Sequence, residues 1–393
     1  MRYTMKKRFI ILAIVVTFIL LMISCAKKNE TYTIEEVDGV KYVKNSSIPI
    51  DKSLNIRVEE LLTLNGYNEL SNDGEDSFYS VNQLKVSPDG LIFINDDSSF
   101  KLYKYSPTGV LLDTLVYQGA GPGELTVPAI MSLLDNYVVL TSSGIANYYD
   151  FDLKFIEKHT TPFTDITYTM FSASSDRIIQ SCFTYDKRGD SYPKDYWVFE
   201  KIKKLDLEQS TISELEFKLE SYFPDHYKGE FIEKFKISKG QDEFYLAVQS
   251  KSTYAIDVYD YNFNHKMKIE FPFKALSFTE EEIDFLKNEY PQGTEDFSML
   301  YKYCDYKLAI SNLYYDSASA HLFVERPQEL ATHSVKFDVF KEGVYINSFN
   351  FTVNEESFNP LAMGLGFNFD ISGSKLYYYN NVENKVSIYQ LVF

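Results

Sequence analysis

The stretch LKVSPDGLIFINDDSSFKLYKYSPTGVLLDTL, residues 84–115, decides the fold. It holds four short apolar segments, separated by Pro88-Asp89-Gly90, a polar run and Pro107-Thr108-Gly109. Segments rich in β-branched and aromatic residues predict strands, and the short turns between them predict hairpins. Four antiparallel strands joined in this way form one blade of a β-propeller.

The same pattern recurs five more times along the chain. The further copies open at Ile130, Phe171, Phe235, Ile310 and Phe367. The sequence has 32 Tyr and 31 Phe residues, which suit pleated, half-buried sheets. We therefore expect an all-β, six-bladed β-propeller over residues 48–393. A jelly roll or a pair of β-sandwiches is the alternative, but neither repeats one four-stranded unit in this way.

Two further segments complete the expected architecture. Only three strands remain in the sixth copy, and residues 55–65, NIRVEELLTLN, offer a spare strand before the first full blade. We expect this N-terminal strand to close the last blade, which leaves no open sheet edge. Between copies four and five, Thr279 and Glu282 have the spacing of a capping box. This pattern predicts one short helical insertion over residues 277–290, with its charged side facing water.

The N-terminus has the pattern of a secretion signal. Basic residues precede an apolar run of about 15 residues, too short for the roughly 20 that span a membrane, and Ser24-Cys25 follows. Met22-Ile23-Ser24-Cys25 resembles a lipobox, with Met where Leu is usual. We expect a lipoprotein signal peptide at residues 1–24, lipid attachment at Cys25 and a tether or linker over residues 25–47. An uncleaved anchor helix is the alternative.

The charge balance limits the partners. The net charge is −17, and cleavage after Ser24 would remove four basic residues and give −21. Binding to nucleic acid needs a basic face that neutralises phosphates, so no nucleic-acid partner is expected. The same balance disfavours adhesion to an anionic membrane beyond the lipid itself.

A glycine-rich stretch, residues 119–124 (GAGPGE), raises the question of a phosphate site. Pro122 removes a backbone donor, Glu124 would repel phosphate, and a strand pattern follows where a phosphate loop needs a helix. The stretch lies between copies one and two. There it resembles the inter-blade connector of NHL-type propellers and, more closely, the six-bladed β-propeller lipoproteins common in Bacteroidetes; the SPDG turn at 87–90 is of the same style. The resemblance implies a propeller in the cell envelope, no established catalytic residues, and Cys25 as its only functional residue.

The polar residues give no strong catalytic or metal signal. No CxxC, HxH or HExxH spacing occurs. By comparison with lactonase propellers, which hold calcium on inner strands, Asn82, Asn312 and Asp370 are the positional candidates; we favour the interpretation that they are turn or edge residues whose hydrogen bonds are satisfied. The acidic loop Ser71–Asp76 lacks the register of a calcium loop and is interpreted as solvated. We expect no metal site, no catalytic residue and no cofactor.

Three other features have both a structural and a functional interpretation. Arg188-Gly189-Asp190 spells an adhesion tripeptide, which chance explains. Tyr377–Tyr379 and Tyr301–Tyr306 could form platforms for sugars, although packing between blades is favoured. Cys182 and Cys304 could pair in an envelope compartment, whereas two free buried thiols are the preferred alternative.

Two functional hypotheses follow. The first is a lipid-anchored, monomeric propeller of the bacterial envelope, on the periplasmic or surface side of the outer membrane, which binds a protein or glycan partner without catalysis. The second is a propeller hydrolase or lyase with a metal or polar site in the central channel.

Overall fold

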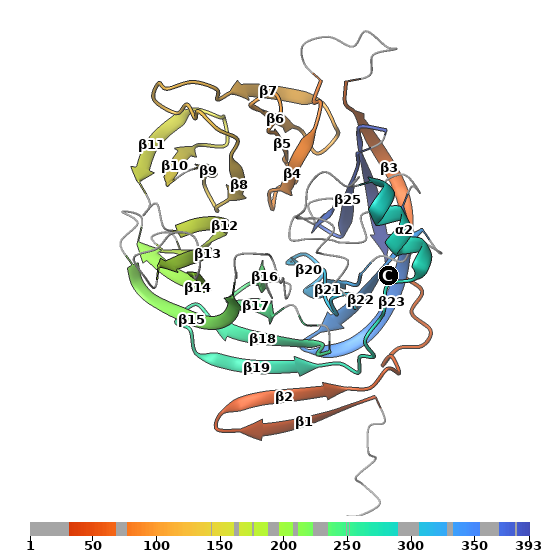
Figure 1. Ribbon diagram of the computed structural model, residues 1–393. Helices are drawn as coiled ribbons and strands as arrows, with labels where there is room; N and C mark the ends of the chain where they lie inside the picture. The colour runs from red at the N-terminus through yellow and green to blue at the C-terminus, as the bar shows by residue number, and fades with distance from the viewer. Residues whose placement is uncertain are drawn as a thin grey trace, which may run out of the picture.

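The structure is a six-bladed β-propeller, which confirms the expected fold class (Figure 1). This computed structural model describes residues 31–67, 77–142, 144–160, 165–174, 177–187, 196–206, 211–222, 235–248, 250, 252–289, 306–327, 333–353, 369–381 and 383–393. Six antiparallel blades of four strands each surround a central channel, and each begins with its innermost strand. The six blades coincide with the six sequence copies.

The blades have the following strands. Blade 1 consists of β4 (Val81–Val86), β5 (Ile92–Asp96), β6 (Lys101–Tyr105) and β7 (Leu111–Val116), and blade 2 of β8 (Ile130–Leu133), β9 (Val138–Ser142), β10 (Ile145–Tyr149) and β11 (Phe155–Thr160). Blade 3 consists of β12 (Asp165–Ser174), β13 (Arg177–Lys187), β14 (Tyr196–Asp206) and β15 (Thr211–Tyr222), and blade 4 of β16 (Phe235–Lys239), β17 (Glu243–Val248), β18 (Ala255–Asp260) and β19 (His265–Glu270). Blade 5 consists of β20 (Asn312–Asp316), β21 (His321–Glu325), β22 (Ser334–Lys341) and β23 (Val344–Thr352), and blade 6 of β24 (Phe369–Ser372), β25 (Lys375–Asn380), β26 (Lys385–Val392) and β3 (Arg57–Asn65).

The ring closes through the expected N-terminal strand. β3 pairs antiparallel with β26 and forms the outer strand of blade 6. Six clusters of buried apolar side chains hold the ring together, one at each junction of neighbouring blades. The aromatic residues are concentrated in these clusters because two facing sheets offer them wide, flat surfaces.

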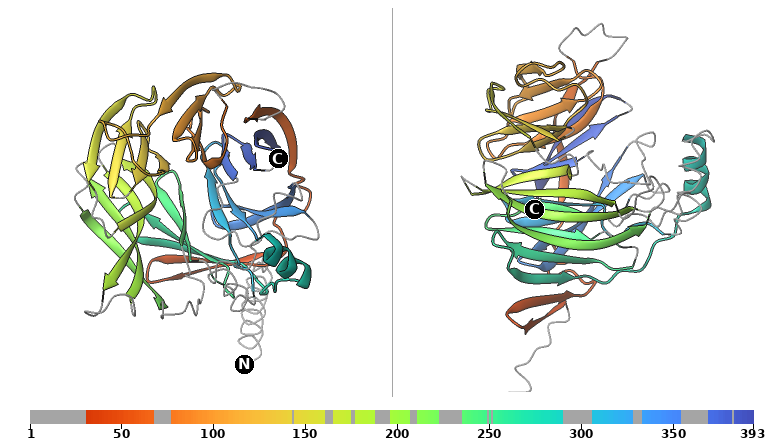
Figure 2. Two further views of the ribbon diagram at one scale, coloured as in Figure 1. Left: turned by 45° about the horizontal axis from the view of Figure 1, so that its top comes forward. Right: turned by 60° about the vertical axis from the view of Figure 1, so that its left-hand side comes forward.

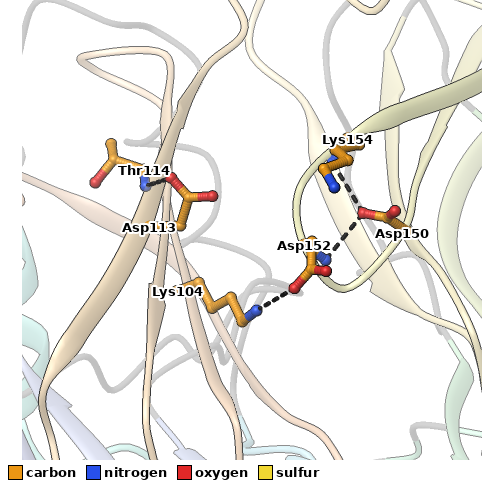
Figure 3. Close-up of polar contacts among 6 residues, drawn as sticks. All are labelled: Lys104, Asp113, Thr114, Asp150, Asp152 and Lys154. Atoms are coloured by element: carbon orange, nitrogen blue, oxygen red, sulfur yellow. Dashed lines mark hydrogen bonds and ion pairs between the residues drawn. The ribbon is translucent and has the colours of Figure 1, made fainter.

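A recurring turn follows the third strand of blades 1, 2 and 4, at Tyr105-Ser106, Tyr149-Asp150 and Tyr259-Asp260. In blade 2, Asp150 Oδ1 accepts hydrogen bonds from the backbone N–H groups of Asp152 and Lys154, both at 2.9 Å (Figure 3). Leu153 between them has φ 59°. Asp260 holds the matching turn of blade 4 in the same way, and Ser106 holds that of blade 1.

One of these turns also connects two blades. Lys104 on β6 of blade 1 reaches Asp152 in the turn of blade 2, with 3.1 Å between Nζ and Oδ1 (Figure 3). The lysine side chain is 10% exposed and the aspartate 71% exposed. The pair therefore has water on one side, and we expect it to contribute little to stability beyond fixing the turn.

The glycine-rich stretch is a connector between blades 1 and 2. Its backbone folds around the carboxylate of Glu124, which accepts the N–H of Gly121 at 2.7 Å. A Cβ on Gly119 would overlap this carboxylate, and one on Gly123 would overlap the ring of Phe155. The loop thus encloses the Glu124 carboxylate, which occupies the place that a bound phosphate would need. The strand β8 follows the loop, whereas a phosphate-binding loop is followed by a helix.

The segment expected to be a tether differs in the structure. Within residues 25–47, β1 (Tyr32–Val37) and β2 (Val40–Asn45) form a hairpin, and β2 pairs in parallel with β19 at the rim of blade 4 (Figure 1). Burial of Val43, which is 0% exposed, drives this addition. Asp38 and Gly39 both have positive φ, the conformation of a tight hairpin turn. The folded part therefore begins before residue 48.

The helical insertion is present as α2 (Glu280–Glu289), and it projects beyond the sheets on one side of the ring (Figure 2). The capping box forms: Thr279 Oγ1 accepts the N–H of Glu282, and the Glu282 carboxylate accepts the N–H of Thr279. The expectation that the charged side faces water is wrong for Glu282. Its side chain is 2% exposed and pairs with Lys307 at 2.5 Å, because the helix start docks at the neck of the insertion.

Candidate functional site

A cavity among the described residues lies at one mouth of the central channel. Its volume is about 360 Å³, and residues of all six innermost strands or their turns line it. The volume is at the lower end of the range typical of small-molecule sites. The ends of β4, β8, β16 and β24 contribute to the wall of this cavity, together with residues from within β12 and β20.

Polar side chains of the innermost strands bind the backbone of the neighbouring blade. Five of the six junctions carry such bonds among the described residues. The acceptors are Gln83 for Met131 N–H, Ser132 for Met170 N–H, Ser238 for Tyr315 N–H, Asp316 for the N–H groups of Gly373 and Ser374, and Asp370 for Val86 N–H. An innermost strand has one unpaired edge, so these bonds satisfy N–H groups that would otherwise be orphaned.

The three positional candidates of the sequence analysis are only partly brought together. Asn312 and Asp370 line the cavity, whereas Asn82, on β4, is not part of its wall. Asp370 accepts the N–H of Val86 at 2.9 Å and of Ile371 at 3.0 Å. Burial raises the pKa of Asp370, and the positive charge of Lys85 opposes the rise. The Oδ1 of Asn312 accepts the N–H of Leu313, so these groups already have partners.

Other polar groups remain available to a ligand. Lys85 lines the cavity and has no hydrogen-bonded or ion-paired partner among the described residues. Lys239 pairs with Asp135 at 2.5 Å, which joins blades 4 and 2 across the end of blade 3. Both side chains of this pair are more than a third exposed. Tyr315 adds an aromatic ring to the wall and stacks on Tyr245. The wall therefore offers ammonium groups, a carboxylate and a flat ring.

A buried carboxyl lies behind this wall, and no motif in the sequence indicates it. Asn312 donates to the hydroxyl of Tyr314 at 2.9 Å, and this hydroxyl donates to Glu325 Oε2 at 2.7 Å. Burial raises the pKa of Glu325 to about 7, against the opposing effects of the Tyr314 hydrogen bond and the charge of Lys236. Asn312 and Tyr314 connect the carboxyl to the cavity, since both line it.

The remaining sequence features contribute little to a site. Tyr377, Tyr378 and Tyr379 are at most 5% exposed and belong to the clusters between blades, in agreement with the packing interpretation. Outside the described residues lie Ser71–Asp76, Arg188–Asp190, Tyr301–Asp305, Cys25 and Cys304. Cys182 is on β13, but its side chain is not described, so the expected pair of free thiols and the alternative disulfide are both untested.

The described residues contain neither a cluster of metal ligands nor a membrane-spanning helix. No three His, Cys, Asp or Glu side chains in this part of the chain lie close enough to hold a metal ion. No helix in the same part is long and apolar enough to span a bilayer.

Comparisons with known proteins support the fold. No family model matches the chain, and no curated protein matches its sequence. A solved member of the DUF4221 family from Bacteroides vulgatus is similar to it with a TM-score of 0.50 and 11% identity, over 86% of this chain and 98% of that one.

Two further solved structures are more distant. A candidate exported protein from Bacteroides fragilis has a TM-score of 0.49 and 14% identity, over 90% of this chain and 100% of its own. Virginiamycin B lyase from Staphylococcus aureus has a TM-score of 0.44 and 11% identity, over 86% and 100%. At such identities the likeness concerns the fold alone.

Proposed function

We propose that the protein is a lipid-anchored propeller of the bacterial cell envelope that binds a glycan or protein partner at the channel mouth and does not catalyse a reaction. The observation that carries the proposal is that the polar side chains of the channel wall fall into two groups, one bound to the backbone and one open to a ligand. Asp370, Ser132 and Ser238 are acceptors for backbone N–H groups of the next blade. Lys85 and the exposed Lys239–Asp135 pair remain to contact a ligand.

The alternative of a hydrolase or lyase needs acidic or amide groups that are free to act on a substrate. Both carboxylate oxygens of Asp370 accept N–H groups, and Asn312 bonds to its own strand and to Tyr314. Removing these groups from their present partners would leave backbone donors of innermost strands unpaired, at a cost of about 1–3 kcal/mol each. Their arrangement therefore suits a rigid wall better than reactive chemistry.

The chemistry of the wall indicates the kind of group that would bind. Ammonium groups, serine hydroxyls and one tyrosine ring suit the hydroxyls and the apolar face of a sugar, or a polar side chain of a protein. A ring of six rigid blades holds these groups in fixed positions, so that little conformational entropy is lost on binding.

A matched pair of lysine variants tests the site. Binding of purified protein to an envelope-glycan array, and to a membrane extract of the same bacterium, is compared with Lys85→Ala and Lys158→Ala. Lys158 lies exposed on the outer strand β11, away from the channel. We expect Lys85→Ala to weaken binding at least several-fold and Lys158→Ala to leave it unchanged. Equal binding by both variants at unchanged melting temperature would place the ligand elsewhere.

The anchor is tested separately, through Cys25. Mass spectrometry of the protein from its membrane fraction should show an acylated N-terminal cysteine, and Cys25→Ser should move the protein to the soluble envelope fraction. An unmodified chain that starts at Met1 would support the anchor-helix alternative instead.

A further inference from the structure

The N-terminal segment is built into the rim of the propeller rather than hanging from it. β2 pairs with β19 over residues 41–44, and the Asn45 side chain binds three backbone groups at the junction of blades 4 and 5. Its Nδ2 donates to the carbonyls of Glu270 and Gly343, and its Oδ1 accepts the N–H of Tyr345. These bonds fix the first strands of the chain to two blades.

The strap, residues 46–51, continues along blade 5 towards the strand that completes blade 6. Ile50 donates its N–H to the carbonyl of Tyr345 at 3.2 Å, and Asn347 binds the carbonyls of Asp51 and Leu54. The N-terminal segment is therefore bonded to blade 4 and then to blade 5 before it enters blade 6 as β3.

The free length of chain next to Cys25 is short. Thr31 already belongs to the folded part, since its carbonyl accepts the N–H of Ser46 at 2.8 Å. Only residues 26–30 lie between it and Cys25, and six Cα–Cα steps reach at most about 21 Å. A tether through residue 47 would have reached about 80 Å. A lipid on Cys25 therefore holds the hairpin within one short tether of the bilayer.

The surface nearest this attachment point exposes apolar side chains beside two acidic ones, Glu35, which pairs with Lys44, and Glu36. Ile34 and Val37 on β1 are 50% and 51% exposed, and Ile48 and Ile50 of the strap are also exposed. β1 is the outer strand of the six-stranded sheet that contains blade 4, so its edge is unpaired, and Ile34 and Val37 project from opposite faces of this edge strand. Apolar side chains at the bilayer surface gain free energy when they leave water.

From these observations we infer that the rim of blade 4, formed by the β1–β2 hairpin and residues 46–51, faces the bilayer and holds the propeller edge-on. The hairpin lies on the outer rim of the ring and not at either mouth of the channel (Figure 1). The axis of the central channel consequently lies parallel to the membrane plane. A ligand can then reach the cavity by moving along the membrane surface. This inference rests on the lipid attachment at Cys25 proposed above.

Two matched cysteine positions test the orientation. Glu36 on β1 of blade 4 and Asp113 on β7 of blade 1 are both exposed acidic residues of outer strands, on opposite sides of the six-bladed ring. Each is changed to Cys in a chain with Cys182→Ser and Cys304→Ser and carries a fluorophore. A hexahistidine replaces residues 1–25 and attaches the protein to nickel-chelating phosphatidylcholine vesicles. The readout is quenching by nitroxide lipids, which needs no acylation.

We expect strong quenching at position 36 and almost none at position 113. A further Ile34→Ser, Val37→Ser pair, and separately a twenty-residue Gly/Ser spacer after residue 30, should each lower the quenching at 36. Equal quenching at both positions would overturn the inference, as would a dimer in solution that buries position 36. Because the vesicles replace the natural lipid, failure here and absence of acylation on Cys25 are separate results.

Discussion

Replacement of Glu325 by Gln should change how the stability of the propeller depends on pH. In the unfolded chain this carboxyl ionises near pH 4.5, whereas burial raises its pKa to about 7 in the folded protein. The contribution of Glu325 to the free energy of unfolding is therefore fully present below pH 4.5, and it is lost as the pH rises through about 7. The glutamine side chain can still accept the Tyr314 hydroxyl but does not ionise, so the variant lacks this loss.

The magnitude follows from the rise in pKa. Relative to low pH, the raised pKa lowers the free energy of unfolding of the wild type by about 1 kcal/mol at pH 5 and by about 3 kcal/mol at pH 7. The loss between pH 5 and pH 7 is therefore about 2 kcal/mol. With an unfolding entropy of about 2.1 cal/mol/K per residue over roughly 360 residues, 1 kcal/mol corresponds to about 1.3 °C. The difference in melting temperature between variant and wild type should thus grow by about 3 °C from pH 5 to pH 7.

Thermal unfolding followed by circular dichroism in buffers of constant ionic strength measures this difference. Glu36→Gln on the outer strand β1, where the side chain is exposed, serves as the control and should give a curve parallel to wild type. Parallel curves for Glu325→Gln as well would refute the reasoning. They would mean that Lys236 or water keeps the carboxyl ionised in the folded state.

Three further changes test the ring itself by thermal unfolding or proteolysis. Asp316→Asn should lower the free energy of unfolding by about 3–5 kcal/mol, because this carboxylate is 1% exposed and accepts N–H groups of two blades. The control Asp113→Asn, at an exposed position, should leave the free energy of unfolding unchanged. Similar losses for both variants would contradict the role of Asp316 in joining blades 5 and 6. Gly119→Ala should cost about 1–3 kcal/mol through overlap with the Glu124 carboxylate, more than Gly39→Ala, which has no neighbour within 4 Å. Asn45→Ala should expose the hairpin to limited proteolysis while the ring melts at a temperature close to wild type; unchanged cleavage would argue against the strap.

The sequence was sufficient for the blades because their information is local. Tyr149-Asp150 and Tyr259-Asp260 mark turns in which a side chain binds N–H groups two and four residues ahead, and such short-range contacts leave a pattern. The hairpin β1–β2 had the same kind of signal. Val37-Asp38-Gly39-Val40 is an Asp-Gly turn between apolar residues, a pattern that predicts a hairpin where a tether was expected.

The channel mouth could not be derived in this way. Ser238 and Tyr315 are 77 residues apart, and Asp370 and Val86 are 284 apart, so their pairing depends on how the blades meet. Glu325 and Glu282 look like ordinary surface glutamates in the sequence. Their burial depends on contacts with Tyr314 and Lys307 that only the folded ring creates.

The closure of blade 6 has a consequence for biogenesis. β3 is synthesised before all six innermost strands, and its partner β26 follows every other strand of the described residues. Pairings so distant in sequence form slowly, because a long loop must close before any contact compensates for the lost entropy. A ribosome or a translocation channel therefore releases β26 before β3 can find its place. The ring closes only after β26 has been made, and until then the unpaired edges of blade 6 are open to association with other chains.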